Sequence, residues 1–185
     1  MGLFDWLLGK KKQEPGVKPY FDPTKVKLED LRPGWLVDFD MKTWEVIARH
    51  RYDMGDGFEM IEWELRSGNE IRYLCREEDD GIYWTLMKKV PLGAIDPGLK
   101  KHILQYEDPP QRLQYEGMVY EMVSYGGAKF FKNGMPPAVP FLYWEYESSD
   151  GTKVVTVEQW GDTEFEASAG EYVEEYQFSN ILPRE

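Results

Sequence analysis

The stretch Phe141-Leu-Tyr-Trp-Glu-Tyr-Glu147, followed by Ser148-Ser-Asp-Gly151, carries the strongest structural signal in this chain. Aromatic residues favour β-strands, and a polar run that ends in Asp-Gly is typical of a tight turn between antiparallel strands. An earlier stretch, Met60-Ile-Glu-Trp-Glu-Leu-Arg66, has the same build and is also followed by a turn, Ser67-Gly-Asn69. We therefore predict that both stretches are strands and that they are copies of one structural unit.

The residues that precede these two strands also correspond. Residues 37–47 align with residues 113–123 at an offset of 76 (113 − 37), and Trp63-Glu64 aligns with Trp144-Glu145 at an offset of 81 (144 − 63). The difference of five residues falls in a longer loop of the second copy, where insertions are tolerated. The sequence therefore predicts a mainly β fold: two tandem antiparallel β-rich units, each a small barrel or sandwich, related by a pseudo-twofold repeat and covering one another's open faces.

Between the two units, the sequence predicts a connector helix. Asp96-Pro97 supplies a capping residue and a proline at the first helical position, and Leu99, Ile103 and Tyr106 then fall on one face. The predicted organisation is an amphipathic N-terminal segment (1–12), a linker (13–27), a first β unit (28–90), a connector with one helix (91–111) and a second β unit (112–185).

The first twelve residues differ from the rest of the chain. On a helix they place aliphatic and aromatic side chains on one side, with three lysines behind them, so we predict a short amphipathic helix. Because so short a helix is marginal in water, its apolar face needs a cover. An anionic membrane surface suits both halves of the segment, and the alternatives are a partner protein or the chain's own fold. The predicted membrane- or partner-binding residues are Leu3, Phe4, Trp6, Leu7, Leu8, Lys10, Lys11 and Lys12.

Composition excludes several classes of protein. With 42% hydrophobic and 15% aromatic residues a core can form, whereas 34 acidic against 22 basic residues, a net charge of −12, argue against a nucleic-acid binder. Cys75 is the only cysteine, so the chain has no internal disulfide and no cysteine-based zinc site. Since no apolar run approaches the ~20 residues of a membrane-spanning helix, we expect a cytoplasmic protein, peripheral on the inner face of the cell membrane if its N-terminal segment binds there.

The sequence offers little sign of catalysis or metal binding. His50 and His102 are the only histidines, and neither has a metal-ligand neighbour at a suitable spacing. We predict no catalytic residue, metal site or cofactor, although a Cys75–histidine pair stays open as an alternative. Four aspartates in predicted turns lack the spacing of a calcium-binding loop, namely Asp53, Asp56, Asp79 and Asp80.

One candidate ligand groove follows from the repeated Trp-Glu pairs. Glu64 and Glu145 hold equivalent positions, and two carboxylates in different environments can act as a general acid and a general base. Trp63 and Trp144 could stack on a ligand, or fill the core. We therefore name Trp63, Glu64, Trp144 and Glu145 as the candidate groove, with two solvent-facing carboxylates as the alternative.

Three features together resemble the bacterial domain-of-unknown-function family 4178. They are the opening Pro33-Gly34, the paired Trp-Glu strands, and the ending from Glu164-Phe-Glu-Ala-Ser-Ala-Gly-Glu-Tyr-Val173 to Asn180-Ile-Leu-Pro183. The resemblance covers residues 28–183 and implies a β-rich bacterial cytoplasmic module with a membrane-associated partner, such as a small membrane protein. It supplies no active-site residues.

We therefore expect a non-enzymatic bacterial accessory or scaffold protein that binds a partner at the inner membrane surface. The alternative is a module that binds a small molecule or a cation, and polyamines would suit its acidity.

Overall fold

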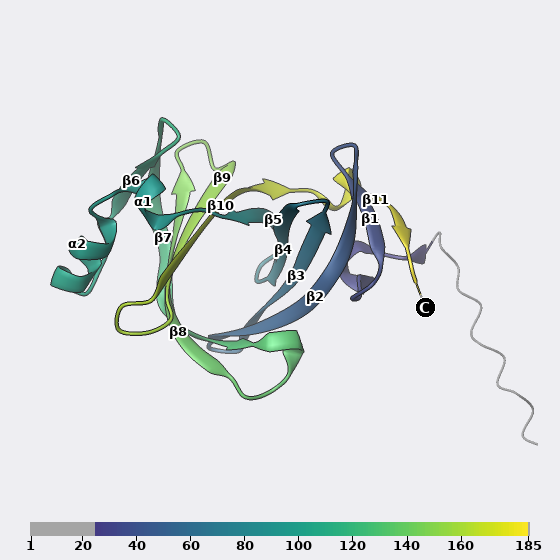
Figure 1. Ribbon diagram of the computed structural model, residues 1–185, viewed down its shortest axis with the longest axis horizontal. Helices are drawn as coiled ribbons and strands as arrows, with labels where there is room; N and C mark the ends of the chain where they lie inside the picture. The colour runs from purple at the N-terminus through teal and green to yellow at the C-terminus, as the bar shows by residue number, and fades with distance from the viewer. Residues whose placement is uncertain (1–24, 185) are drawn as a thin grey trace, which may run out of the picture.

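A computed structural model describes residues 25–184 of the chain (Figure 1). Its strands form one antiparallel sheet, and short helices connect or cover them. The strands are β1 (Leu36–Phe39), β2 (Lys42–Gly55), β3 (Phe58–Ser67), β4 (Glu70–Glu78), β5 (Ile82–Lys89), β6 (Arg112–Tyr115), β7 (Met118–Phe131), β8 (Val139–Ser148), β9 (Lys153–Gln159), β10 (Phe165–Val173) and β11 (Ser179–Leu182). The helices are α1 (Leu92–Ile95), α2 (Leu99–Tyr106) and the 3-10 helices η2 (Leu28–Asp30), η3 (Lys132–Gly134) and η4 (Glu175–Gln177).

The sheet closes into an eight-stranded barrel. Its order is β11-β1-β2-β3-β4-β5-β10-β9-β8-β7-β6, and an additional pairing of β2 with β7 joins the two ends of the eight long strands. This seam is short and runs from Arg51–Phe131 to Asp53–Lys129. Figure 1 shows the ring of strands, with α1, α2 and β6 on one side and β1 and β11 on the other.

The mainly antiparallel β class and the connector helix are confirmed, but the two predicted units meet in a different way. We expected a small barrel or sandwich in each unit, with the units covering one another's faces. Instead, β5 pairs with β10 and β2 pairs with β7, so the strands of both units join edge to edge in one barrel. The physical reason is that closure provides hydrogen-bond partners for the edges that each unit would otherwise expose.

The two series of strands correspond in length and in irregularities. β1 to β5 contain 4, 14, 10, 9 and 8 residues, and β6 to β10 contain 4, 14, 10, 7 and 9. β2 and β7 each have a bulge after the fifth residue, Val46 and Met122. Trp63 and Trp144 are each the sixth residue of their strand. The pseudo-twofold repeat itself stays a prediction.

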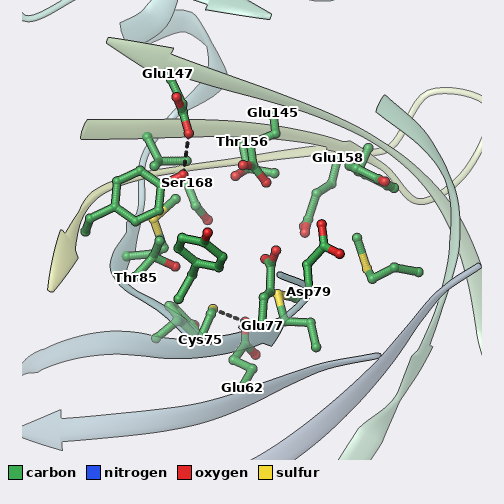
Figure 2. Close-up of a pocket in the computed structure, with 18 of the residues that line it drawn as sticks. Glu62, Cys75, Glu77, Asp79, Thr85, Glu145, Glu147, Thr156, Glu158 and Ser168 are labelled. Carbon is green, nitrogen blue, oxygen red and sulfur yellow. Dashed lines mark hydrogen bonds between the residues drawn. The ribbon is translucent and has the colours of Figure 1, made fainter. Parts of the chain in front are cut away.

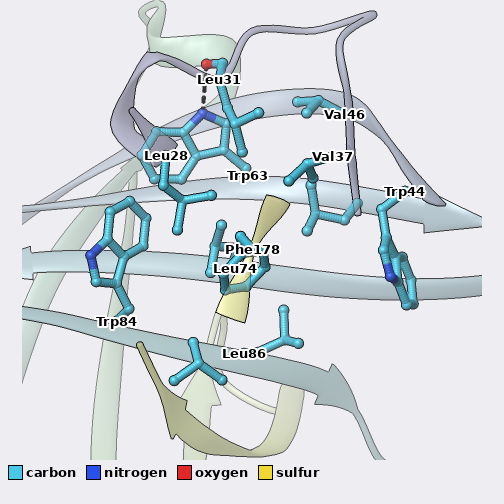
Figure 3. Close-up of a cluster of buried hydrophobic side chains, with 12 residues drawn as sticks. Leu28, Leu31, Val37, Trp44, Val46, Trp63, Leu74, Trp84, Leu86 and Phe178 are labelled. Atoms are coloured by element: carbon cyan, nitrogen blue, oxygen red, sulfur yellow. Dashed lines mark hydrogen bonds between the residues drawn. The ribbon is translucent and has the colours of Figure 1, made fainter. Parts of the chain in front are cut away.

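One hydrophobic cluster covers the outer face of β2 to β5. Trp63 is 1% exposed, stacks on Trp84 with ring centroids 5.6 Å apart, and donates its indole N–H to the carbonyl of Leu31 at 2.8 Å. Figure 3 shows Leu28 and Leu31, from the segment before β1, beside these rings. Phe178, from the segment before β11, belongs to the same cluster and stacks on Phe39 with ring centroids 4.6 Å apart. The segments that precede β1 and β11 thus shield this face of the barrel.

A second cluster covers the outer face of β7 to β10 and lies under the connector. Leu99 and Ile103 of α2 are buried against Trp144 and its neighbours, whereas Tyr106 is exposed. Tyr106 does not join the predicted apolar face because the helix ends there and Glu107 turns into the left-handed conformation. These two large clusters lie outside the barrel, so its interior can combine polar groups with smaller apolar clusters.

The predicted N-terminal segment 1–12 lies outside the described residues, as does most of the predicted linker. Within residues 25–184, none of the helices has the length and apolar character needed to cross a membrane.

Candidate functional site

A cavity of about 390 Å³ lies inside the barrel, and its walls are rich in carboxylates. Glutamates from β3, β4, β8 and β9 line it, and Asp79 and Asp80 in the turn between β4 and β5 stand beside them. Figure 2 shows Glu145, Glu147 and Glu158 on one wall, facing side chains from β3 and β4 on the opposite wall. The lining glutamates are Glu62, Glu77, Glu145, Glu147 and Glu158.

Strand alternation explains why these acids face inward. Successive side chains of a strand point to opposite faces of the sheet. On β8, Trp144 and Tyr146 are buried in the outer hydrophobic cluster, so Glu145 and Glu147 between and beyond them line the cavity. On β3, Trp63 likewise packs outward, and the preceding Glu62 faces the cavity. A Trp-Glu pair in this chain therefore marks a strand with an apolar outer face and an acidic inner face.

Two of the glutamates, Glu62 and Glu158, lie near each other and have a cation beside them. We name Glu62 and Glu158 the compensated pair. Burial, followed by repulsion from Glu158, raises the pKa of Glu62 to about 7, and the ammonium of Lys89 opposes this shift. Burial also raises the pKa of Glu158, although the Lys89 ammonium lies 3.8 Å away and also pairs with Glu166. The hydroxyl of Tyr52 donates to Glu62 at 3.2 Å.

The other three glutamates, which we name the acid trio, are Glu77, Glu145 and Glu147. Burial, followed by the charges of Glu77 and Glu147, raises the pKa of Glu145 to about 7. Burial also raises the pKa of Glu77. Glu147 accepts a hydrogen bond from the hydroxyl of Tyr172. Within residues 25–184 no lysine, arginine or histidine forms an ion pair with any member of the trio.

The remaining wall of the cavity combines apolar and aromatic side chains with the hydroxyl groups of Thr85, Thr156 and Ser168. Met60, Met87 and Val154 contribute aliphatic surface, and Tyr73 and Tyr143 contribute rings. Cavities that bind small molecules commonly measure about 300–1,000 Å³ and combine apolar walls with a few placed polar groups. By size and composition this cavity suits a small ligand that carries positive charge on an apolar frame.

The sequence-predicted groove residues do not lie together. Trp63 and Trp144 are buried in separate hydrophobic clusters on the outer faces of the barrel. Glu145 lines the cavity, whereas Glu64 lies beside His50, with 4.0 Å between the imidazole Nε2 and the carboxylate. Sequence reasoning missed the other four cavity glutamates. The spacings Glu62-x-Glu64 and Glu145-x-Glu147, which place acids on one face of a strand, could have revealed Glu62 and Glu147, but they give no signal for Glu77 and Glu158.

The open alternative of a cysteine–histidine pair has no contact to support it. Cys75 is buried, and burial raises the pKa of its thiol. Its sulfur lies 3.9 Å from Glu62, while His50 accepts the backbone N–H of Asn133 and His102 packs against Tyr106. In residues 25–184, no group of three or more histidine, cysteine, aspartate or glutamate side chains is arranged to hold a metal ion.

Comparison with known proteins gives a family without an assigned activity. The family model described as "Domain of unknown function (DUF4178)" matches residues 32–175. A protein of Aquifex aeolicus (strain VF5), titled "Uncharacterized protein", is 34% identical over 157 residues, which cover 85% of this chain and 85% of that protein. No solved structure matches the chain.

Proposed function

The chain belongs to the family described as domain of unknown function (DUF4178), and since that description names no activity, we propose from the barrel interior that the protein binds a small organic cation. One observation carries this proposal: the acid trio lines a cavity and has no cationic partner among the described residues. The proposal assigns no reaction to the protein.

The energetics of buried carboxylates support a cationic ligand. An ionised carboxylate away from water is unfavourable unless it is paired, and the raised pKa values of Glu62 and Glu145 express that cost. A ligand ammonium would pair with these groups and restore their ionised form. The net charge of −12 also favours the approach of cations, because acidic clefts concentrate ions of opposite charge.

The shape of the site favours an organic cation over a metal ion. Calcium needs about six to eight oxygens at one point, and magnesium needs an octahedral set. The cavity instead spreads its carboxylates over opposite walls (Figure 2), and its lining also contains apolar side chains such as Met87 and Val154. Polyamine-like molecules, in which ammonium groups alternate with methylene chains, belong to the class that this surface suits.

Titration calorimetry tests the proposal. We expect spermidine to bind at about pH 8, and to bind more weakly at about pH 6, because protons then occupy Glu62 and Glu145 while the amines stay charged. Glu164→Gln, which removes an exposed acid outside the cavity, is the matched control for net charge and should keep the affinity. The proposal fails if neither spermidine nor simpler amines bind at either pH.

A second candidate function rests on the N-terminal sequence. Residues 1–12 join an apolar face to three lysines, which supports attachment to an anionic membrane surface or to a membrane-associated partner. We expect the full chain to sediment with anionic vesicles and a variant lacking residues 1–12 to stay in the supernatant, with neutral vesicles as the control. Equal sedimentation of both proteins would exclude membrane attachment through this segment.

A further inference from the structure

One half of the cavity already has a cation of the chain's own beside it, namely Lys89. The ammonium of Lys89 lies against Glu158, pairs with Glu166 and influences Glu62, so a primary ammonium on an aliphatic stem already serves the compensated pair. Its Nζ also lies 5.6 Å from the ring centroid of Tyr73, within the range of a cation–π contact. An N–H-bearing cation with a methylene stem is therefore compatible with the chemistry of this interior.

The acid trio is the half that lacks such a cation. Glu145 is enclosed within the barrel and lines the cavity, yet no hydrogen bond or ion pair joins its carboxylate to another residue of the described chain. Glu77 is in the same condition, whereas Glu147 has the hydroxyl of Tyr172 as its donor. Glu145 is half-buried, and its carboxylate lines the cavity, where it is accessible to a group that donates hydrogen bonds.

An apolar surface adjoins the trio. Cys75, Met87 and Val154 form a buried cluster, against which Met60 and Tyr172 pack. All five of these residues also line the cavity. A ligand whose charge meets the trio would therefore lay its uncharged part on this cluster, where each buried methylene adds about fourfold to the affinity.

We propose that the ligand is an alkylamine with N–H donors, an inference that rests on the proposed function. Its ammonium binds Glu77, Glu145 and Glu147. Its alkyl stem lies on Cys75, Met87 and Val154. Charge-assisted N–H to carboxylate bonds are among the strongest that a protein makes. A quaternary ammonium offers no N–H and is recognised instead by aromatic cages. It would leave Glu145 without a donor.

A matched pair of probes tests the class of ligand. Butylammonium and butyltrimethylammonium share the stem and the charge but differ in N–H donors. Calorimetry on the full chain at about pH 8 should show butylammonium binding at least about tenfold more tightly, and binding should weaken as the stem is shortened to methylammonium. Equal or tighter binding of butyltrimethylammonium would overturn the inference on ligand class.

Variants and methyl resonances test the location. Glu145→Gln and, independently, Glu77→Gln should each weaken butylammonium binding by about tenfold or more, whereas Glu164→Gln should change it by less than about threefold. In spectra of methyl-labelled methionine, the Met87 signal should shift on binding, and that of the fully exposed Met41 should not. Unchanged affinity in both trio variants would refute the location while leaving cation binding in place. If no cation of the panel binds the wild-type chain, the proposed function itself fails.

Discussion

Replacing Glu145 with glutamine is expected to stabilise the unliganded protein at about pH 8 by about 3 kcal/mol, and to leave its stability near pH 4.5 unchanged. The pKa of Glu145 rises from 4.5 to about 7 on folding. An acid with a raised folded pKa contributes its full stability below its unfolded pKa, and that stability is lost as the pH rises through the folded pKa. Glutamine has nearly the same shape as glutamate and does not ionise, so the variant does not lose this folding stability as the pH rises.

Urea unfolding of both proteins across this pH range measures the difference. The matched control is again Glu164→Gln, which removes one charge from the surface and should change the free energy of unfolding by less than about 0.5 kcal/mol. A gain of the same size at both ends of the range would show that the effect is not titration of Glu145. A loss at about pH 8 would show that the carboxylate has a partner that stabilises it.

Replacing Trp63 with alanine is expected to lower the free energy of unfolding by about 3–5 kcal/mol, the range for truncating a buried aromatic side chain. The indole is 1% exposed, and its N–H satisfies the carbonyl of Leu31. Alanine would leave a void beside Trp84 and an unpaired buried carbonyl. Since small domains have a total stability of about 5–15 kcal/mol, this single change would remove a large part of it.

The measurement is again urea unfolding, with Tyr176→Ala as the control. Tyr176 is an aromatic residue that is 84% exposed, so its truncation should cost less than about 0.5 kcal/mol. Trp144→Ala, which removes the corresponding indole from the second cluster and its bond to Asp108, should resemble Trp63→Ala. A loss below about 1 kcal/mol for Trp63→Ala would mean that this cluster does not anchor the barrel.

Local features of the fold could be predicted from the sequence, and closure could not. The strands around Trp63 and Trp144, their turns and the connector helix all depend on neighbouring residues, so alternation and capping signals reveal them. The pairings of β5 with β10 and of β2 with β7 join segments that are far apart in the chain. No periodicity within one strand specifies its partner across such a distance.

The same limit explains what could be predicted of the site. Glu145 repeats Glu64 in the second unit, which makes it a candidate site residue, and the structure places it in the cavity. Its relation to Glu77 arises only when β4 and β8 come to face each other across the closed barrel, so sequence spacing cannot show it. The sequence leaves Trp63 and Trp144 open to ligand stacking or to the core, and burial places both in the core.

The position of the two hydrophobic clusters has a consequence for divergence among related chains. Side chains on the outer faces of the strands, such as Trp63 with Trp84 and Trp144 with Val157, form the two large hydrophobic clusters that stabilise the fold. Side chains on the inner faces, which we call the inward rows in contrast to the outward rows, would contact the ligand. Mutations in one row can therefore be selected with little disturbance of the other. A lineage that keeps its outward aromatic residues can exchange lumen residues and acquire a new specificity on an unchanged scaffold.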